Sequence, residues 1–344
     1  MSGWVPPPPS TGATGPSGAP VTWAAPEETP GLGTSDLLRG AWHLYGSAAG
    51  RLLTVAVIPE AVRAILTLPS LLTAMLGFRA MALVMSDMSR FETNPEAFQA
   101  EIRAATRMSP ELAVVVGLCG GLTFFVIAIG WSALTAAALE VAAGRSFRVE
   151  AMFQAVAARR TGILVPAVVV GIVWALLGLA SGLLQPTSTG VMSASQAALL
   201  SLFAVLVLAL TIAGFALAVY WSLGLPAILA ERLGLRDGLA RGARLTKGIR
   251  MRLGLAILAA SLLAAITVGV VAGLIAVVGG LAAGSLDVGI GGYLLVSLVG
   301  AFLWAPFIPS LLAVAYQDRI AQEATLTPPP PSDPTESAPS PTGA

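Results

Sequence analysis

Long apolar blocks separated by short polar segments make up most of the chain between residues 34 and 323. Most blocks run about 18 residues or more, the length that an α-helix needs to cross roughly 30 Å of hydrocarbon. The pattern therefore predicts six membrane-spanning helices, at residues 52–77, 111–139, 162–184, 197–225, 253–279 and 291–316. The first block contains Pro59 and Pro69 as well as charged side chains, so an alternative crossing at 61–84 stays open.

Composition indicates a chain dissolved in lipid rather than in water. Of its 344 residues, 56% are hydrophobic and 11% are charged, whereas roughly a quarter of the residues in a soluble domain are charged. The predicted fold class is all-α, a polytopic membrane bundle of about six transmembrane helices. The net charge of +1 gives no indication of a nucleic-acid partner.

Both ends of the chain differ from the apolar middle. Residues 1–33 and 324–344 are rich in Pro, Gly, Ser and Thr, a composition that cannot bury enough apolar surface to offset its ordering entropy. We therefore predict two disordered tails that flank a membrane domain at 34–323. The tails are either simple tethers or docking segments for a proline-binding partner, with Trp4 and Trp23 as anchors.

The positions of basic residues predict the orientation. Lys and Arg gather between spans two and three and between spans four and five. The connections 185–196 and 280–290 contain no basic residue, and Asp287 is the one charged residue in the second of them. The positive-inside rule then places both termini in the cytoplasm. The segment 79–110 is an exception, because it carries four arginines along with acidic residues. We expect it to be an outer loop with a short helix capped by Asn94.

A threefold internal repeat emerges when the predicted cytoplasmic segments are aligned. Residues 34–53 match 234–254 with a constant offset of 201, and residues 146–164 fit between them. We predict three units, at about 34–140, 146–231 and 234–318, each an amphipathic helix followed by two spans.

Each even-numbered span is expected to end on a carboxylate. These carboxylates are Glu140, Glu231 and Asp318. After the first two, Gly144 and Gly234 should turn the chain into the next amphipathic helix.

The third amphipathic helix has two distinct faces at helical spacing. One face carries Leu235, Leu239, Gly242, Thr246, Ile249 and Leu253. The opposite side is basic, and such a helix lies in the interface with its charges towards anionic headgroups of the cytoplasmic leaflet. The candidate headgroup contacts are Arg241, Arg244, Lys247 and Arg250.

Glu60 and Arg63 are the charged pair most deeply placed in a predicted span. Residues three apart share a helix face and can pair, and charges within hydrocarbon are costly enough to suggest a function. The pair either lines a polar path or lies at the interface. Pairs of glycines four apart, at 117/121, 178/182 and 269/273, are expected to pack between helices of this chain rather than to form a dimer seam.

Few residues are suited to catalysis. His43 is the only histidine and Cys119 the only cysteine, which excludes an HExxH zinc site and a CxxC pair. There is no GxSxG elbow and no P-loop. We therefore expect neither an enzyme nor a bound metal or cofactor.

Three segments resemble a bacterial membrane-protein family. LPAILAERLGLRDGLARGARLTKGIRMRLG at 225–254 is similar to its cytoplasmic signature. SDLLRGAWHLYGSAAGRLL and PSLLAVAYQDRIAQE resemble its first helix and its closing tyrosine, aspartate and arginine. Over about 34–323 the chain resembles a family whose members are named either YciC-like or after the membrane domain of glycerophosphoryl diester phosphodiesterases. The resemblance implies six helices in the bacterial cytoplasmic membrane. Diesterase activity is not implied, because this chain lacks the soluble catalytic domain.

Two functional hypotheses follow from these observations. The leading one is a non-enzymatic scaffold or accessory component of the envelope that engages the lipid bilayer or a membrane-protein partner. The alternative is a transporter or channel-like protein with a polar path near Glu60 and Arg63. Neither a solute nor an oligomeric state follows from the sequence.

Overall fold

The computed structural model describes residues 32–86, 93–94, 96–98, 101, 109–183 and 194–326. The described residues form α-helices and no strand. The predicted tails lie outside this range, apart from the few residues that adjoin the membrane domain. The helices are α1 (Thr34–Ser86), α4 (Pro110–Ala142), α5 (Val149–Ala157), α6 (Arg160–Leu183), α7 (Ala194–Trp221), α8 (Gly224–Ala230), α9 (Leu235–Leu245), α10 (Arg250–Ala283), α11 (Leu286–Trp304) and α12 (Phe307–Leu326).

Six helical stretches within the described residues are long and apolar enough to cross a membrane. The predictions of an all-α fold and of a multi-pass membrane protein are confirmed at this level. The stretches are Thr34–Thr73, Glu111–Ala142, Arg160–Leu177, Ser201–Ala230, Arg250–Ala283 and Val288–Thr325.

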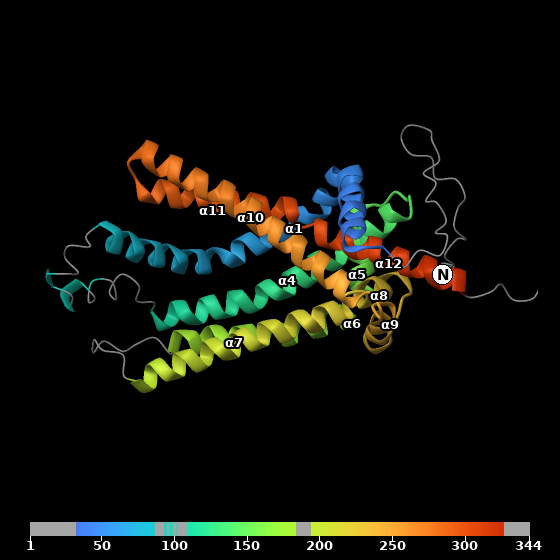
Figure 1. The fold of residues 1–344 in the computed structure, drawn as a ribbon, viewed down its shortest axis with the longest axis horizontal. Coiled ribbons are helices and arrows are strands. Elements are labelled where there is room, and N and C mark those ends of the chain that lie inside the picture. The colour runs from blue at the N-terminus through green and yellow to red at the C-terminus, as the bar shows by residue number, and fades with distance from the viewer. Residues whose placement is uncertain are drawn as a thin grey trace, which may run out of the picture.

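The long helices pack together at one end of the molecule and separate towards the other (Figure 1). The packed end holds α5, α8, α9 and α12. Burial follows this arrangement. Of an 18-residue apolar stretch within Val288–Thr325, 50% is buried, against 6% of the corresponding stretches within Ser201–Ala230 and Arg250–Ala283. The core is therefore concentrated at one end, and the faces of α7 and α10 are open to their surroundings.

Helix α12 is the centre of that core. Its residues Leu311, Ala313 and Ala315 are fully buried, and the helix packs against α1, α4, α8 and α10. Small side chains on α4, among them Ala133 and Ala137, allow its backbone to approach closely.

The predicted interfacial segment and the predicted first span correspond to the two parts of α1, which meet at a kink. The second part is longer than the predicted span and extends to Ser86, so residues 79–86, expected in a loop, are helical. The chain changes direction at Ala48, where φ is −134° and ψ is 19°. Neither glycine nor proline breaks the helix there, and Pro59 and Pro69 lie inside it. In the adjoining loop, the Asn94 side chain accepts a hydrogen bond from the Ala97 amide at 3.2 Å, as predicted.

The fourth and sixth predicted spans are each interrupted close to a proline. Helix α7 ends at Trp221 and α8 begins at Gly224. Helix α11 ends at Trp304 and α12 begins at Phe307. These two boundaries lie 83 positions after the end of α7 and the start of α8. Pro226 and Pro309, in the first turns of α8 and α12, keep the same spacing. A proline cannot donate the backbone hydrogen bond that would continue the previous helix.

Hydroxyl groups satisfy a carbonyl oxygen at each interruption. The Tyr45 hydroxyl donates to the Leu303 carbonyl at 2.9 Å, and the Thr246 hydroxyl donates to the Tyr220 carbonyl at 3.0 Å. Leu303 and Tyr220 are the penultimate residues of α11 and α7. Carbonyls at a helix end have no intrahelical partner. Other segments of the chain thus supply the missing donor at each interruption.

The turns after Glu140 and Glu231 use different residues. Gly144 has a φ of 70°, as its predicted role requires. After Glu231 the left-handed residue is Arg232, with a φ of 59°, and not Gly234, which is the extended residue before α9. Asp318 also departs from the prediction, because α12 continues to Leu326 and Asp318 lies inside the helix.

Close packing of glycines is confirmed at only one of the predicted pairs. A Cβ added to Gly121 would lie 2.9 Å from the carbonyl oxygen of Gly171, so α4 and α6 cross here with backbones in contact. Gly269 and Gly273 have nothing within 4 Å of such a Cβ, and the prediction that they pack within the chain is wrong. The side chains around 178 and 182 lie outside the described residues.

Helix α9 is held against α8 by glycines that permit backbone contact. A Cβ added to Gly242 would lie 2.5 Å from the Cα of Gly224. We expect Gly242→Ala to push α9 away from α8 and to lower the free energy of unfolding by about 1 to 3 kcal/mol. Gly214→Ala is the matched control, because nothing lies within 4 Å of a Cβ at that helical position. Thermal unfolding in mild detergent measures both, and equal melting temperatures would contradict the proposed contact.

Candidate functional site

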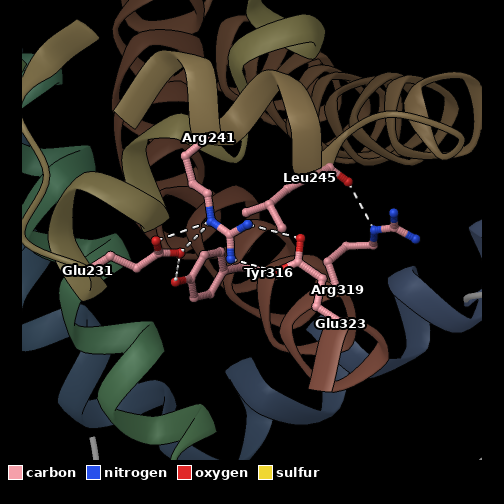
Figure 2. Close-up of polar contacts among 6 residues, drawn as sticks. All are labelled: Glu231, Arg241, Leu245, Tyr316, Arg319 and Glu323. Carbon is pink, nitrogen blue, oxygen red and sulfur yellow. Dashed lines mark hydrogen bonds and ion pairs between the residues drawn. The ribbon is translucent and has the colours of Figure 1, made fainter. Parts of the chain in front are cut away.

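A cluster of charged and polar side chains joins α8, α9 and α12 at the packed end (Figure 2). Glu231 is the C-terminal cap of α8, Arg241 lies on α9 and Tyr316, Arg319 and Glu323 lie on α12. The three α12 residues are three and four apart, so they share one face of that helix.

Arg241 is the centre of this cluster. Its Nε donates to both carboxylate oxygens of Glu231 at 3.0 and 3.1 Å. Its two terminal nitrogens donate to the two oxygens of Glu323 at 2.9 and 2.6 Å. The planar guanidinium suits this forked pairing, which an ammonium could not reproduce. Arg241 therefore ties the end of α8 and the end of α12 to α9.

Tyr316 completes the coordination of Glu231. Its hydroxyl donates to Glu231 Oε1 at 2.9 Å, while the residue as a whole is buried. A buried tyrosine hydroxyl needs such a partner. The aromatic ring thus packs in the core and its polar tip reaches the ion pair.

Arg319 binds the other end of α9. Its Nε donates to the Leu245 carbonyl at 2.9 Å and one terminal nitrogen donates to the Lys247 carbonyl at 3.3 Å. Leu245 is the last residue of α9, so a cation lies at the negative end of the helix dipole. Arg241 and Arg319 together hold the middle and the end of α9.

The electrostatics of Arg241 agree with its role as a charged anchor. Its hydrogen bonds to Glu323 raise the pKa of the guanidinium, and those to Glu231 add to the effect, while partial burial opposes it. The side chain is 20% exposed, and those of Glu231 and Glu323 are 29% and 41% exposed. The cluster is a partly solvated clamp that stays charged.

The other predicted carboxylates lie in separate local pairs. Glu140 accepts two hydrogen bonds from Arg145, at 2.6 and 3.1 Å. Asp318 accepts one from Gln322 at 2.9 Å. Glu60 and Arg63 form an ion pair of 2.6 Å within α1. The structure therefore brings Glu231 and Arg241 into one site, connects Asp318 to it only through Gln322, which accepts a hydrogen bond from Arg319, and leaves Glu60 and Glu140 outside it.

The four predicted headgroup residues divide between two environments. Arg241 is engaged by two carboxylates of the chain itself. Arg244 and Lys247 are exposed, and Arg250 is partly buried. These three line an open hollow beside α9 together with Tyr220 and Asp237.

Three members of the cluster, Tyr316, Arg319 and Glu323, were not proposed as site residues from the sequence, although Tyr316 and Arg319 belong to the closing motif of the family resemblance. Their spacing was a usable signal, because it places three polar side chains on one face of a helix that is otherwise apolar in its first half. The contact of this face with α9 could not be predicted from spacing along the chain, since Arg241 and Glu323 are 82 positions apart.

The arrangement is suited to holding helices together. Both carboxylates are bound by the same guanidinium, and no group of three or more His, Cys, Asp or Glu side chains in the described part of the chain is placed to bind a metal ion. Comparison of the chain with protein-family models, curated proteins and solved structures finds no match. Fold and composition define the class, a multi-pass α-helical membrane protein.

Replacing Arg241 tests the clamp. We expect Arg241→Gln to lower the free energy of unfolding by roughly 1 to 3 kcal/mol, because two carboxylates lose their common cation. The loss in the free energy of unfolding should lie near the lower end of this range, since Glu323 is 41% exposed and its charge is screened by solvent. Chemical unfolding in detergent provides the measurement.

Arg236→Gln serves as the control, because Arg236 is an exposed residue of the same helix and should change stability by no more than about 0.5 kcal/mol. Tyr316→Phe should cost about 1 kcal/mol and show coupling to Arg241→Gln in a double-mutant cycle. A clamp is refuted if Arg241→Gln and Arg236→Gln unfold alike.

Proposed function

We propose that the chain is a non-enzymatic component of the bacterial cytoplasmic membrane, a scaffold or accessory subunit that engages the cytoplasmic leaflet or a membrane-protein partner. The observation that carries the proposal is the Arg241 clamp. Its polar groups are used to fix α9 against α8 and α12, which displays a rigid basic helix at the packed end. Such a surface suits binding rather than a chemical reaction.

The burial of the interfacial segments supports this proposal. At the start of α1, Leu37 and Ala41 are buried while Arg39 and His43 are exposed. Helix α5 buries Met152 and Val156, and α9 buries Gly238, Gly242 and Leu245. Each segment thus has a packed side and an open side, as a helix lying in the interface requires.

The threefold repeat is part of the proposal and has support from matching local geometry. Helices α1 and α9 begin at Thr34 and Leu235, 201 positions apart. The kink at Ala48 corresponds to Ile249, which precedes α10 with a φ of −115° and a ψ of 1°. The hydroxyl donors Tyr45 and Thr246 keep the same offset.

We also propose that both termini are cytoplasmic and that the chain is related to YciC-like membrane proteins. Support for the orientation comes from Arg and Lys at the packed end. Aromatic residues typical of an interface gather there as well: the Trp304 ring lies 5.3 Å from Phe307 and 6.3 Å from Trp42, between ring centroids. Support for the relationship is the similarity of the segment 225–254.

Purification in mild detergent tests the function. The expected result is that a membrane-protein partner or a specific lipid is retained, and that a reporter fused after Arg236 is active only in the cytoplasm. Retention should fall in the Arg241→Gln variant, because α9 is no longer held in place, and should persist in Arg236→Gln. Recovery of the wild-type chain as a monomer without partner or specific lipid would refute the proposal.

The ion pair of Glu60 and Arg63 supports a second candidate function, transport. Both residues lie within the candidate span Thr34–Thr73, their side chains are 13% and 21% exposed, and the charges are 2.6 Å apart. Ionisable groups at such depth often line a substrate or ion path. A self-neutralised pair is also compatible with a purely structural role, so the scaffold remains the leading proposal.

A pair of variants separates the two roles of this ion pair. Glu60→Gln alone leaves Arg63 uncompensated in the span and should cost about 3 kcal/mol of stability. Adding Arg63→Met should restore most of that stability. A transporter would lose solute flux in proteoliposomes with the stable double variant, whereas a scaffold would retain its partner. Absence of flux for every solute tested with the wild type would eliminate transport.

A further inference from the structure

An open hollow of about 530 Å³ lies between the end of α7 and the turn from α9 to α10. Cationic side chains outnumber carboxylates in its lining, so the hollow is electropositive. The lining residues are Tyr220, Asp237, Ala240, Ala243, Arg244, Lys247 and Arg250.

The basic residues of α9 are divided between the clamp and this hollow. Arg241 points to Glu231 and Glu323 (Figure 2). The side chains of Arg244 and Lys247 are exposed and form no hydrogen bond or ion pair with any other described residue. Two cations therefore lie at the rim of the hollow without an ion pair to the described chain, and Asp237 is the one carboxylate among the lining residues, against three cationic side chains.

Arg250 is held in place before any ligand binds. Its guanidinium carbon lies 4.1 Å from the centre of the Tyr220 ring, and one terminal nitrogen donates to the Ala243 carbonyl at 3.1 Å. Its Nε is buried and has no hydrogen-bond partner. A cation that is already ordered and partly desolvated binds an anion at a lower entropic cost than a free side chain.

The hollow lies at the level expected for lipid headgroups. Tyr220 and Trp221 end α7, and such aromatic residues favour the boundary between hydrocarbon and water. Gly248, with a φ of 88°, turns the chain so that α10 begins at Arg250, and the N-terminus of a long helix adds positive potential.

The geometry points to a binding site for the phosphate of an anionic phospholipid headgroup, with Arg244 and Lys247 contacting the phosphate and Arg250 held against Tyr220. This inference rests on the proposed function and names one of its ligands. A lipid rather than free phosphate is favoured because α7 continues from the hollow as an apolar surface. Leu217 and Leu210 are 48% and 44% exposed, which gives the acyl chains a place to lie.

The test uses the full chain in a neutral detergent, with lipid retention measured by native mass spectrometry. Phosphatidylglycerol should bind saturably and more tightly than phosphatidylcholine. The double variant Arg244→Gln/Lys247→Gln should weaken phosphatidylglycerol binding roughly tenfold or more, since each basic residue near a charged lipid contributes appreciably. Arg250 is left unchanged because its contacts also support the turn.

The matched control is Arg39→Gln/Arg236→Gln, which removes the same charge from two other exposed positions and should retain affinity within about twofold. Equal weakening in both double variants would overturn the site, because binding would then reflect overall charge. Binding of inorganic phosphate without phosphatidylglycerol, or equal binding of phosphatidylcholine, would also overturn it.

The scaffold proposal and the lipid site fail separately. If a protein partner is retained while phosphatidylglycerol does not bind saturably, the lipid site is wrong and the scaffold stands. If phosphatidylglycerol binds as expected but Arg241→Gln changes neither stability nor partner retention, the clamp argument behind the scaffold is wrong. The lipid site then remains supported by its own two double variants.

Discussion

A backbone carbonyl that loses its helical partner inside a packed helix bundle must find another donor, and the architecture depends on this constraint. Two spans are interrupted near their packed ends, which exposes the carbonyls of Tyr220 and Leu303. Hydroxyls of Thr246 and Tyr45 bind them. Both donors belong to segments that lead into other spans. The hydrogen bond at each interruption therefore also holds a neighbouring helix in place.

The ion-pair cluster acts on the same elements by a different interaction. Arg241 binds carboxylates from α8 and α12, while Arg319 binds the last carbonyls of α9. Every contact is made at the packed end, and none holds the opposite ends of the spans. Stability is therefore expected to be uneven, highest around α12 and lowest along α7.

Much of the fold follows from sequence because apolar length is a strong signal, and six spans emerge from it. A proline in a span is compatible with a kink or with a broken helix, so Pro226, which lies in the first turn of α8, did not by itself specify the interruption. The clamp depends on tertiary contact. Arg241 looked like a headgroup ligand because helical periodicity assigns it to the basic face, whereas Glu323 on a distant segment determines its environment.

The capping hydroxyl of Tyr45 has a consequence for the order of assembly. Thr246 follows its acceptor by 26 residues, so that contact can form soon after both segments leave the ribosome. Tyr45 precedes Leu303 by 258 residues, so the first helix must wait for the last span to be synthesised. Until then the Tyr45 side chain lacks this acceptor, so the contact between α1 and α11 can form only late in synthesis.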